Sequence, residues 1–564
     1  MGGEMMNREM PVGVDDFKEA REQYYIVDKT AFIGELIDKH KKVTLFTRPR
    51  RFGKTLTMSM LDYFFSIDKK DISKTLFRGL AIDKSEKNYI ENHQNQYPVI
   101  FITLKDFHNP TWESMYRSIR LLMQEVYAQY PYLRNSDALQ PFEQAFIDRI
   151  TYLTAEPEEY QMSLQRLSGF LYKYFGKQPI ILIDEYDAPL QRAYMGRFYQ
   201  EAALFWKGWF NAALKNNRYL HFAVLTGVLR IAKESIFSGL NNLDVYSVLD
   251  EQYSRVFGFT SHEVQRMVQD LQCEDTLREI KQWYDGYTFG QTEIYNPWSV
   301  IKYFATLCKP AAYWISTSDN GILQQLLHNV DTTQLKVLQD LLTGKHVTTS
   351  INDNIIYQNV TLDKSSLYTM LLTTGYLTVD TAIDKADERY ALRIPNEEIR
   401  RVYRLEILNT LIHSWNKDAF DVMSDALVHG QAAVFERQLQ QLLIHFVSAF
   451  DAANKESFYH GFMLGMTALF ITKDYVIESN RESGYGRFDL AIFPMNPVHA
   501  GVIMEFKVAQ SEAELKTKAQ EALQQIETKA YITEFKKRQI ANVWKYGIAF
   551  SGKHVKIVQS TQER

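Results

Sequence analysis

Short apolar runs, separated by longer stretches with helical periodicity, organise the first 260 residues of the chain. Val43–Thr47, Tyr97–Leu104, Pro179–Ile183 and His221–Thr226 are mostly apolar, which is typical of strands buried on both faces of a parallel sheet. The segments between these runs carry apolar residues at helical spacing. Strands and helices that alternate in this way predict a three-layered α/β domain.

Residues 451–564 follow a different order of elements. A buried helix is predicted first, then three strands, a long amphipathic helix and a final strand. These segments are Glu456–Phe470, Tyr475–Glu478, Arg487–Phe493, Gly501–Val508, Ser511 to about Lys537, and Trp544–Phe550.

Four domains follow from these patterns. An α/β core is predicted at 8–255, a helical lid at 256–340, a helical connector at 341–450 and a second, smaller α/β unit at 451–564. The lid contains two aromatic stretches, Trp283–Gly290 and Tyr295–Val300. Aromatic residues around glycine are typical of rigid turns whose rings pack on neighbouring helices.

The stretch Arg48–Thr55 joins the first apolar run to a helix. Gly53, Lys54 and Thr55 suit a phosphate-binding loop: backbone N–H groups surround the phosphates, the lysine reaches them, and the threonine hydroxyl holds Mg²⁺. Arg48 stands where a first glycine is usual. The motif alone leaves open a chance Gly-Lys-Thr at the start of a helix.

A second motif favours nucleotide binding. Asp184 and Glu185 end an apolar strand, and the carboxyl ends of parallel strands form the ligand-binding edge of a sheet. Asp184 suits a Mg²⁺ ligand, and Glu185 suits a residue that polarises the attacking water. Thr226 ends another strand at this edge, and Arg230 lies one loop away. A strand-end acidic turn, a capping threonine and a surface arginine are the alternatives.

Charged residues interrupt two predicted strands of the C-terminal unit. Asp489 lies in one strand, and Glu505 and Lys507 share a face of the next because side chains alternate along a strand. Buried charges require partners or a metal ion. Two carboxylates suit Mg²⁺ or Mn²⁺, and the lysine could act on water and phosphate. A structural network of Lys, Asp and Glu is the alternative.

Composition limits the other possibilities. Lys and Arg total 64 and Asp and Glu total 68, for a net charge of −4, so any nucleic-acid contact must come from a local basic patch. Cys273 and Cys308 are too few for a disulfide framework, which favours a reducing cytoplasm. The longest apolar run, Phe462–Ile471, is too short to span a bilayer. We expect a cytoplasmic protein without a secretory signal or membrane partner.

Two family resemblances fit these motifs. Residues 8–260 resemble the AAA-ATPase-like family of bacterial P-loop NTPases, whose phosphate loop typically has the sequence Arg-Pro-Arg-Arg-Phe-Gly-Lys-Ser/Thr, so Arg48 is part of the family pattern. Residues 450–564 are similar to the PD-(D/E)XK nuclease superfamily. That resemblance implies metal binding by Asp489 and Glu505 and catalysis by Lys507, although no proline precedes the aspartate. Glu456 matches the position of an accessory acid in many members, and Gln525 and Tyr531 lie where some members keep a Gln and a Tyr.

The sequence therefore predicts an ATP-binding switch or motor joined to a Mg²⁺- or Mn²⁺-dependent nuclease that acts on nucleic acid, with DNA favoured. A homo-oligomer is left open. Two alternatives remain: a signalling or nucleic-acid-binding protein that does not cut, and an ATPase whose C-terminal fold holds a protein partner. The expected nucleotide-binding residues are Arg48, Gly53, Lys54, Thr55, Asp184, Thr226 and Arg230. The expected metal ligands are Thr55, Asp184, Asp489 and Glu505. The expected catalytic residues are Glu185, Asp489, Glu505 and Lys507.

Overall fold

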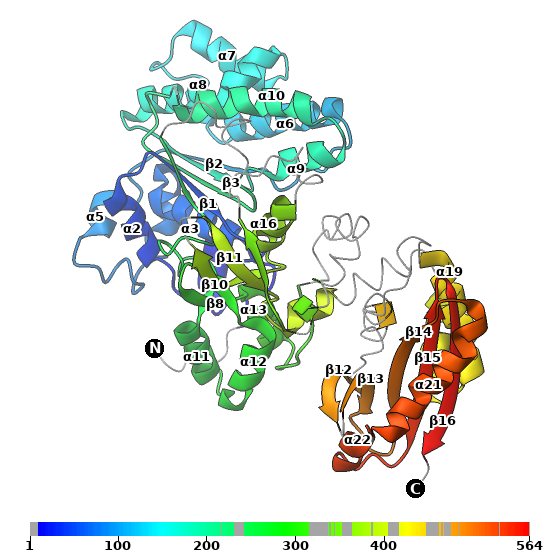
Figure 1. Ribbon diagram of the computed structural model, residues 1–564. Helices are drawn as coiled ribbons and strands as arrows, with labels where there is room; N and C mark the ends of the chain where they lie inside the picture. The colour runs from blue at the N-terminus through cyan, green and yellow to red at the C-terminus, as the bar shows by residue number, and fades with distance from the viewer. Residues whose placement is uncertain are drawn as a thin grey trace. The chain divides into compact units, whose positions relative to one another are not determined.

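We describe the protein from a computed structural model. The chain forms two compact units (Figure 1), Met1–Ser318 with His346–Ile399, and Asp319–Lys345 with Arg400–Arg564. The described residues are 9–215, 217–230, 242–314, 337, 340–342, 344–351, 364–384, 387–403, 417–446, 459, 462–463, 466, 475–483, 486–529 and 531–562.

A five-stranded sheet of order β2-β3-β4-β1-β5 forms the centre of the first unit, and every neighbouring pair is parallel. The four predicted apolar strands are confirmed, and all residues of β1, β3 and β4 are buried. The short edge strand β5 was not predicted. The bounds are β1 Val43–Thr47, β2 Val99–Thr103, β3 Ile180–Asp184, β4 Ala223–Gly227 and β5 Leu243–Tyr246.

Helices cover both faces of this sheet, as the three-layered prediction requires. In Figure 1, α6, α8 and α10 lie on one side and α3 on the other. Two of the segments between β2 and β3 begin at prolines, a 3₁₀ turn at Pro131 and α8 at Pro157. The helices are α1 Phe17–Gln23, α2 Ala31–Lys39, α3 Lys54–Phe65, α4 Lys70–Ser73, α5 Tyr89–His93, α6 Trp112–Ala128, α7 Pro141–Thr151, α8 Pro157–Phe175, α9 Ala188–Met195 and α10 Tyr199–Phe210.

In its described residues, the lid contains helices α11, α12 and α13 and a small antiparallel sheet of order β6-β8-β7. Its aromatic core includes Trp283, Tyr284 and Tyr303, and both cysteines of the chain pack against it. Burial and the neighbouring Cys273 raise the pKa of the Cys308 thiol to about 11. The elements are β6 Phe259–Thr260, α11 Ser261–Asp270, α12 Leu277–Tyr284, β7 Tyr287–Phe289, β8 Thr292–Tyr295 and α13 Pro297–Ala305.

The structure divides the predicted connector, 341–450, between the two units. Its first part forms a sheet of order β10-β11-β9 that belongs to the first unit, where the Thr378 hydroxyl accepts a hydrogen bond from the Thr288 N–H at 2.8 Å. Its later helices belong to the second unit. The elements are β9 Val347–Ser350, α16 Lys364–Thr374, β10 Thr378–Asp384, β11 Arg389–Arg393, α18 Lys417–Val428 and α19 Ala432–Phe446.

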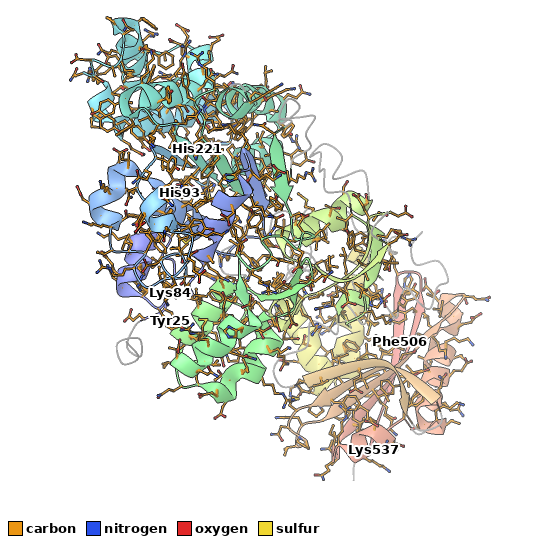
Figure 2. All side chains as sticks on the ribbon, turned by 90° about the vertical axis from the view of Figure 1, so that its left-hand side faces the viewer. Tyr25, Lys84, His93, His221, Phe506 and Lys537 are labelled. Atoms are coloured by element: carbon orange, nitrogen blue, oxygen red, sulfur yellow. The ribbon has the colours of Figure 1, made fainter. Side chains whose placement is uncertain are left out.

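A second five-stranded sheet, of order β12-β13-β14-β15-β16, forms the centre of the second unit. Only β14 and β15 pair in parallel among these strands, and α21 connects them. Phe506 of β14 (Figure 2) packs on the face covered by α18 and α19. The last strand, β16, was not predicted. The elements are β12 Tyr475–Ser483, β13 Gly486–Pro494, β14 Gly501–Val508, α21 Leu515–Thr528, α22 Thr533–Lys537, β15 Val543–Ser551 and β16 His554–Gln562.

Two further predictions concern a helix at 456–470 and the absence of a membrane-spanning segment. Most of the helix predicted at Glu456–Phe470 lies outside the described residues, although Tyr459, Met463 and Met466 are buried in the core of the second unit. None of the described helices combines the length and apolar character needed to cross a bilayer.

Candidate functional site

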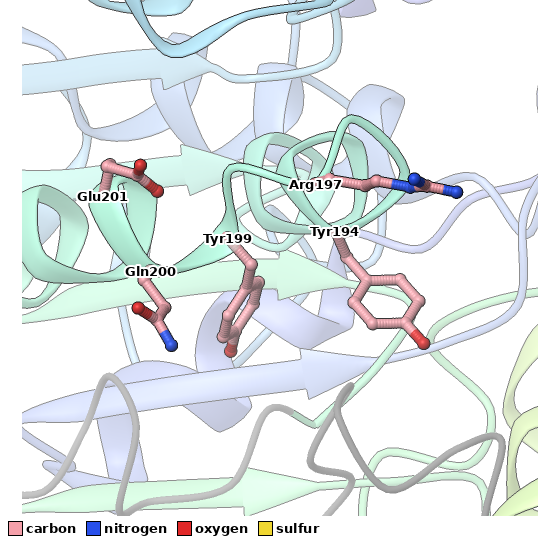
Figure 3. Close-up of a pocket in the computed structure, with 5 residues that line it drawn as sticks. All are labelled: Tyr194, Arg197, Tyr199, Gln200 and Glu201. Atoms are coloured by element: carbon pink, nitrogen blue, oxygen red, sulfur yellow. The ribbon is translucent and has the colours of Figure 1, made fainter.

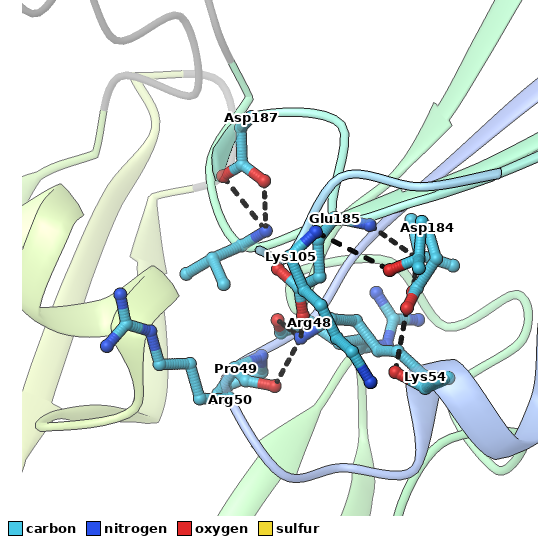
Figure 4. Close-up of polar contacts among 12 residues, drawn as sticks. Arg48, Pro49, Arg50, Lys54, Lys105, Asp184, Glu185 and Asp187 are labelled. Carbon is cyan, nitrogen blue, oxygen red and sulfur yellow. Dashed lines mark hydrogen bonds and ion pairs between the residues drawn. The ribbon is translucent and has the colours of Figure 1, made fainter. Parts of the chain in front are cut away.

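The phosphate loop connects the carboxyl end of β1 to the first turn of α3. Gly53 has a φ of 81°, a backbone conformation that favours glycine, and its carbonyl accepts the Thr57 N–H at 3.0 Å. The Lys54 side chain is almost fully buried. Its Nζ lies 3.2 Å from the Arg48 carbonyl oxygen and 3.1 Å from that of Pro49 (Figure 4). Two carbonyls of the loop therefore hold the Lys54 ammonium.

Lys54 also forms an ion pair with Glu185, with 3.2 Å between Nζ and Oε1. The sequence predicts both residues at the site, and the structure brings them together at the carboxyl edge of the sheet. Glu185 has a φ of 55°, which is uncommon for a residue with a side chain. Its carboxylate thus lies beside the lysine that the motif assigns to phosphate binding.

A chain of hydrogen bonds joins Thr55, Asp184 and Thr226. The Thr55 hydroxyl donates to Asp184 Oδ2 at 2.7 Å, and the Thr226 hydroxyl donates to Asp184 Oδ1 at 2.5 Å. Strand order explains this contact, because β4 lies between β1 and β3. Burial and the neighbouring Glu185 raise the pKa of Asp184, while the two hydroxyls lower it. Hydroxyl and carboxylate oxygens are the donors that Mg²⁺ prefers, so this set fits the ion.

The Arg48 side chain has a structural position instead of the predicted contact with nucleotide. It is fully buried and donates to the carbonyls of Thr47 and Tyr246, both at 2.9 Å, and of Tyr253 at 3.3 Å. The guanidinium also lies 5.2 Å from the centre of the Phe289 ring. We therefore correct the assignment of Arg48 to nucleotide binding: its side chain supports the phosphate loop by bonding three backbone carbonyls.

Aromatic residues of the lid also pack against the phosphate loop. Phe52 packs against the rings of Tyr287 and Phe289, at centroid distances of 5.1 and 5.2 Å. Tyr287 and Phe289 belong to the predicted aromatic turn, which thus holds the phosphate loop as well as the lid helices. The sequence pattern predicts a rigid turn at this place but does not indicate its partner.

Asp187, which was not among the predicted site residues, braces the loop that follows β4. Its buried carboxylate accepts the N–H groups of Val228, at 3.2 and 3.1 Å, and of Leu229, at 2.7 Å. Burial and Glu185 raise its pKa to about 6. These bonds fix the segment that leads directly to Arg230, which is half-buried. The acidic turn after β3 therefore has a structural function beside Asp184 and Glu185.

In the second unit, Asp489 of β13 and Glu505 of β14 lie opposite each other. The Asp489 N–H donates to Glu505 Oε2 at 3.4 Å, and Asp489 Oδ2 accepts the Phe506 N–H at 2.7 Å. Glu505 is only 2% exposed. Lys507 follows two positions later on the same strand and is half-buried. The structure thus brings the two predicted metal ligands together.

Helix α21 completes this second site. The Gln525 amide donates to Glu505 Oε1, and it lies 3.4 Å from the Tyr531 hydroxyl. The helix comes this close because Gly547 of β15, which pairs with Glu505, has no side chain: a Cβ there would lie 2.2 Å from the Ala519 carbonyl oxygen. Glu456, the predicted accessory acid, lies outside the described residues.

Beyond the contacts described above, the described residues show a further cavity but no larger cluster of metal-binding side chains. In the part of the chain that the structure describes, no group of three or more His, Cys, Asp or Glu is placed to hold a metal ion. The turn between α9 and α10 forms a cavity of about 350 Å³ that contains none of the predicted site residues (Figure 3). It is lined by Tyr194, Arg197, Tyr199, Gln200 and Glu201.

Family comparisons agree with these two sites. Residues 11–237 match the family model described as a predicted AAA-ATPase, and residues 454–560 match that of the PD-(D/E)XK nuclease superfamily. One segment of the chain is thus similar to the predicted AAA-ATPase family, and a second is similar to the PD-(D/E)XK nuclease superfamily. Both resemblances expected from the sequence are thereby confirmed. The AAA-ATPase match includes the phosphate loop, and the nuclease superfamily match includes Asp489 and Glu505, whereas the lid lies outside both.

The individual proteins that resemble this chain share little sequence identity with it. An uncharacterized protein from the vnfD 5′ region of Azotobacter chroococcum mcd 1 is 25% identical over 552 residues, which is 95% of each chain. A crystal structure of a Signal Transduction ATPase with Numerous Domains protein with a tetratricopeptide repeat sensor, from Pyrococcus horikoshii, has 10% identity and a TM-score of 0.24. That comparison covers 79% of this chain and 57% of the other. The chain thus spans less than two thirds of that relative.

Proposed function

We propose that the chain is an ATP-binding and ATP-hydrolysing switch that controls a Mg²⁺- or Mn²⁺-dependent nuclease in its second unit. The observation that carries the ATP assignment is the convergence of Lys54, Thr55, Asp184, Glu185 and Thr226 at one edge of the first sheet. The family matches support both halves of the proposal. DNA is the proposed nucleic acid.

In this mechanism the residues of the first site change partners when ATP binds. Lys54 exchanges the Glu185 carboxylate for the β- and γ-phosphates, and Glu185 then accepts a proton from the attacking water. Thr55 and Asp184 would hold Mg²⁺, which neutralises charge on the phosphates. Calorimetry tests this site: Lys54→Ala should abolish ATP binding, whereas Glu185→Gln should bind ATP but hydrolyse it slowly. Equal ATP affinity in wild type and Lys54→Ala would refute the assignment.

In the second site Asp489 and Glu505 would hold the metal ion, while Lys507 orients or deprotonates water and stabilises the pentacovalent phosphate. The test is incubation of the purified protein with circular and linear DNA in Mg²⁺ or Mn²⁺. We expect cleavage by the wild type and its loss in Asp489→Asn and Lys507→Ala. Mg²⁺ or Mn²⁺ should raise the melting temperature of the wild type, and Lys507→Ala should retain this rise because the Lys507 ammonium does not bind the ion.

A second function, nucleic-acid binding without cleavage, is favoured by one observation. The Asp489 and Glu505 carboxylates already accept hydrogen bonds from two backbone N–H groups and the Gln525 amide. Such bonds stabilise negative charge without a metal ion. A wild type that binds DNA but cuts neither substrate in either metal would favour this function.

A further inference from the structure

Arg51 holds a strained position in the phosphate loop. Its φ is 71°, two residues before Gly53 with a φ of 81°. Left-handed backbone conformations favour glycine, and a residue with a side chain keeps one only where its surroundings enforce it. The conformation of this loop therefore depends on what holds the Arg51 side chain.

The lid provides the first contact. The Arg51 guanidinium carbon lies 4.5 Å from the centre of the Trp298 ring, on α13. A guanidinium above an indole face is attracted by the ring, and more strongly where water is excluded. The Tyr313 carbonyl lies 3.5 Å from Arg51 Nη1 and also accepts the Trp298 indole N–H at 3.4 Å. Arg51 and Trp298 are thus tied to one carbonyl.

Glu398 holds the two segments that contact Arg51, because it bonds Ser299, next to Trp298, and Trp314, next to Tyr313. It is fully buried and accepts hydrogen bonds from the Ser299 hydroxyl, at 2.9 and 2.7 Å, and from the Trp314 N–H at 2.9 Å. Burial raises the pKa of Glu398 to about 7, and the charge of Arg51 acts in the opposite direction. Burial likewise lowers the pKa of Arg51, which Glu398 opposes. Each charge therefore offsets part of the desolvation of the other.

We propose that Trp298 and Glu398 are positioning residues of the ATP site, which hold Arg51 and thereby the strained phosphate loop in its anion-binding conformation. The inference rests on the proposed ATP-binding function. Neither residue belongs to the matched AAA-ATPase region. The first unit ends at Ile399, directly after Glu398, and the Trp314 N–H donates to the same carboxylate four residues before Ser318, where the unit also ends. Coupling between two sites acts in both directions. If Glu398 affects ATP binding, bound ATP should in turn affect the conformation of the segments that follow Trp314 and Glu398.

A double-mutant cycle tests the proposal, with ATP affinity measured by calorimetry on the full chain. We expect Trp298→Leu and Glu398→Gln each to weaken ATP binding about tenfold or more, since binding must then restore the strained loop. Arg51→Gly removes the strain, because glycine accepts this conformation. In the Arg51→Gly background, the same two substitutions should therefore have little further effect. An equal loss in both backgrounds would overturn the proposal.

Lys302→Gln is the matched control. Its ammonium lies 5.4 Å from the centre of the same Trp298 ring, so the substitution removes a cation from the indole without touching Arg51. ATP affinity should remain unchanged, and a loss equal to that of Trp298→Leu would overturn the specific role of Arg51. A wild type that binds no ATP would refute the proposed function. ATP binding that is insensitive to Trp298 and Glu398 would refute only this inference.

Discussion

Arg48 replaces the glycine that is usual at the start of a phosphate loop, and its guanidinium satisfies three carbonyl groups in a fully buried position. Glycine at this point would leave both a cavity and unpaired acceptors. The sequence identified the residue but could not show the direction of its side chain, because the partners Tyr246 and Tyr253 are distant in the chain. A positively charged residue in a phosphate motif therefore need not contact phosphate.

Arg48→Ala should lower the free energy of unfolding of the first unit by about 3 kcal/mol or more, because the buried acceptors lose their donor. Arg50→Ala is the control, since the Arg50 guanidinium contacts the Gln191 side chain at 3.3 Å and its removal should change stability by about 0.5 kcal/mol or less. Chemical denaturation measures both. Equal destabilisation by the two substitutions would contradict a structural role for Arg48.

Glu398 should make stability depend on pH. Its pKa is raised from 4.5 to about 7 by burial, so between these values the folded chain binds more protons than the unfolded chain. Stability should fall as pH rises through this window, by on the order of 3 kcal/mol. Glu398→Gln cannot titrate, so its melting temperature should decline less between pH 5 and pH 8. A melting temperature that declines equally in both proteins across that pH range would rule out this ionisation of Glu398.

Among the elements, strands with both faces buried could be predicted from the sequence and edge strands could not. β1, β3 and β4 are apolar runs because helices cover both of their faces. β5 and β16 lie at sheet edges, where polar residues are tolerated and the apolar signal is weak. The acids Asp184, Asp489 and Glu505 were detectable because charge interrupts or ends an apolar strand. Contacts such as Arg51 with Trp298 were not detectable, since no local pattern records which distant elements meet.

The close approach of α21 to β15 leads to a prediction for the second site. In Gly547→Ala the new methyl group would meet the Ala519 carbonyl oxygen at 2.2 Å, so the helix must move and carry Gln525 away from Glu505. We expect a loss of about 1–3 kcal/mol together with lower DNA cleavage. Gly552→Ala is the control, because a methyl group there would meet no described atom within 4 Å beyond its chain neighbours, and only its φ of 57° is unfavourable. Wild-type cleavage by Gly547→Ala would show that Gln525 placement is unimportant.

At the scale of the whole molecule, the boundary between the two units differs from the one predicted. The sequence placed the start of the nuclease unit at 451, whereas Met423, Leu427, Leu439 and Leu443 of α18 and α19 are buried in the core of the second unit. The sequence showed that these segments are helical, but their periodicity does not state which core they join. The same limit applies to β9–β11, which belong to the first unit.

Fragments of the chain test this boundary. Residues 400–564 should melt cooperatively, because they retain α18 and α19. Residues 430–564 lack α18 and with it the buried Met423, Ala426 and Leu427; each large side chain removed from a core costs about 2–5 kcal/mol. Thermal denaturation followed by circular dichroism compares the two fragments. Equal melting temperatures of the two fragments would show that α18 does not stabilise the second unit and is a connector, as the sequence predicts.

The most direct test of the proposed switch is cleavage of circular DNA in Mn²⁺, measured with and without ATP. We expect the wild type to cut at a rate that ATP changes. Lys54→Ala should cut at a rate that ATP does not change, and Asp489→Asn should bind ATP without cutting. A wild type that cuts no nucleic acid, or an ATP response that persists in Lys54→Ala, would contradict the coupling of the two sites.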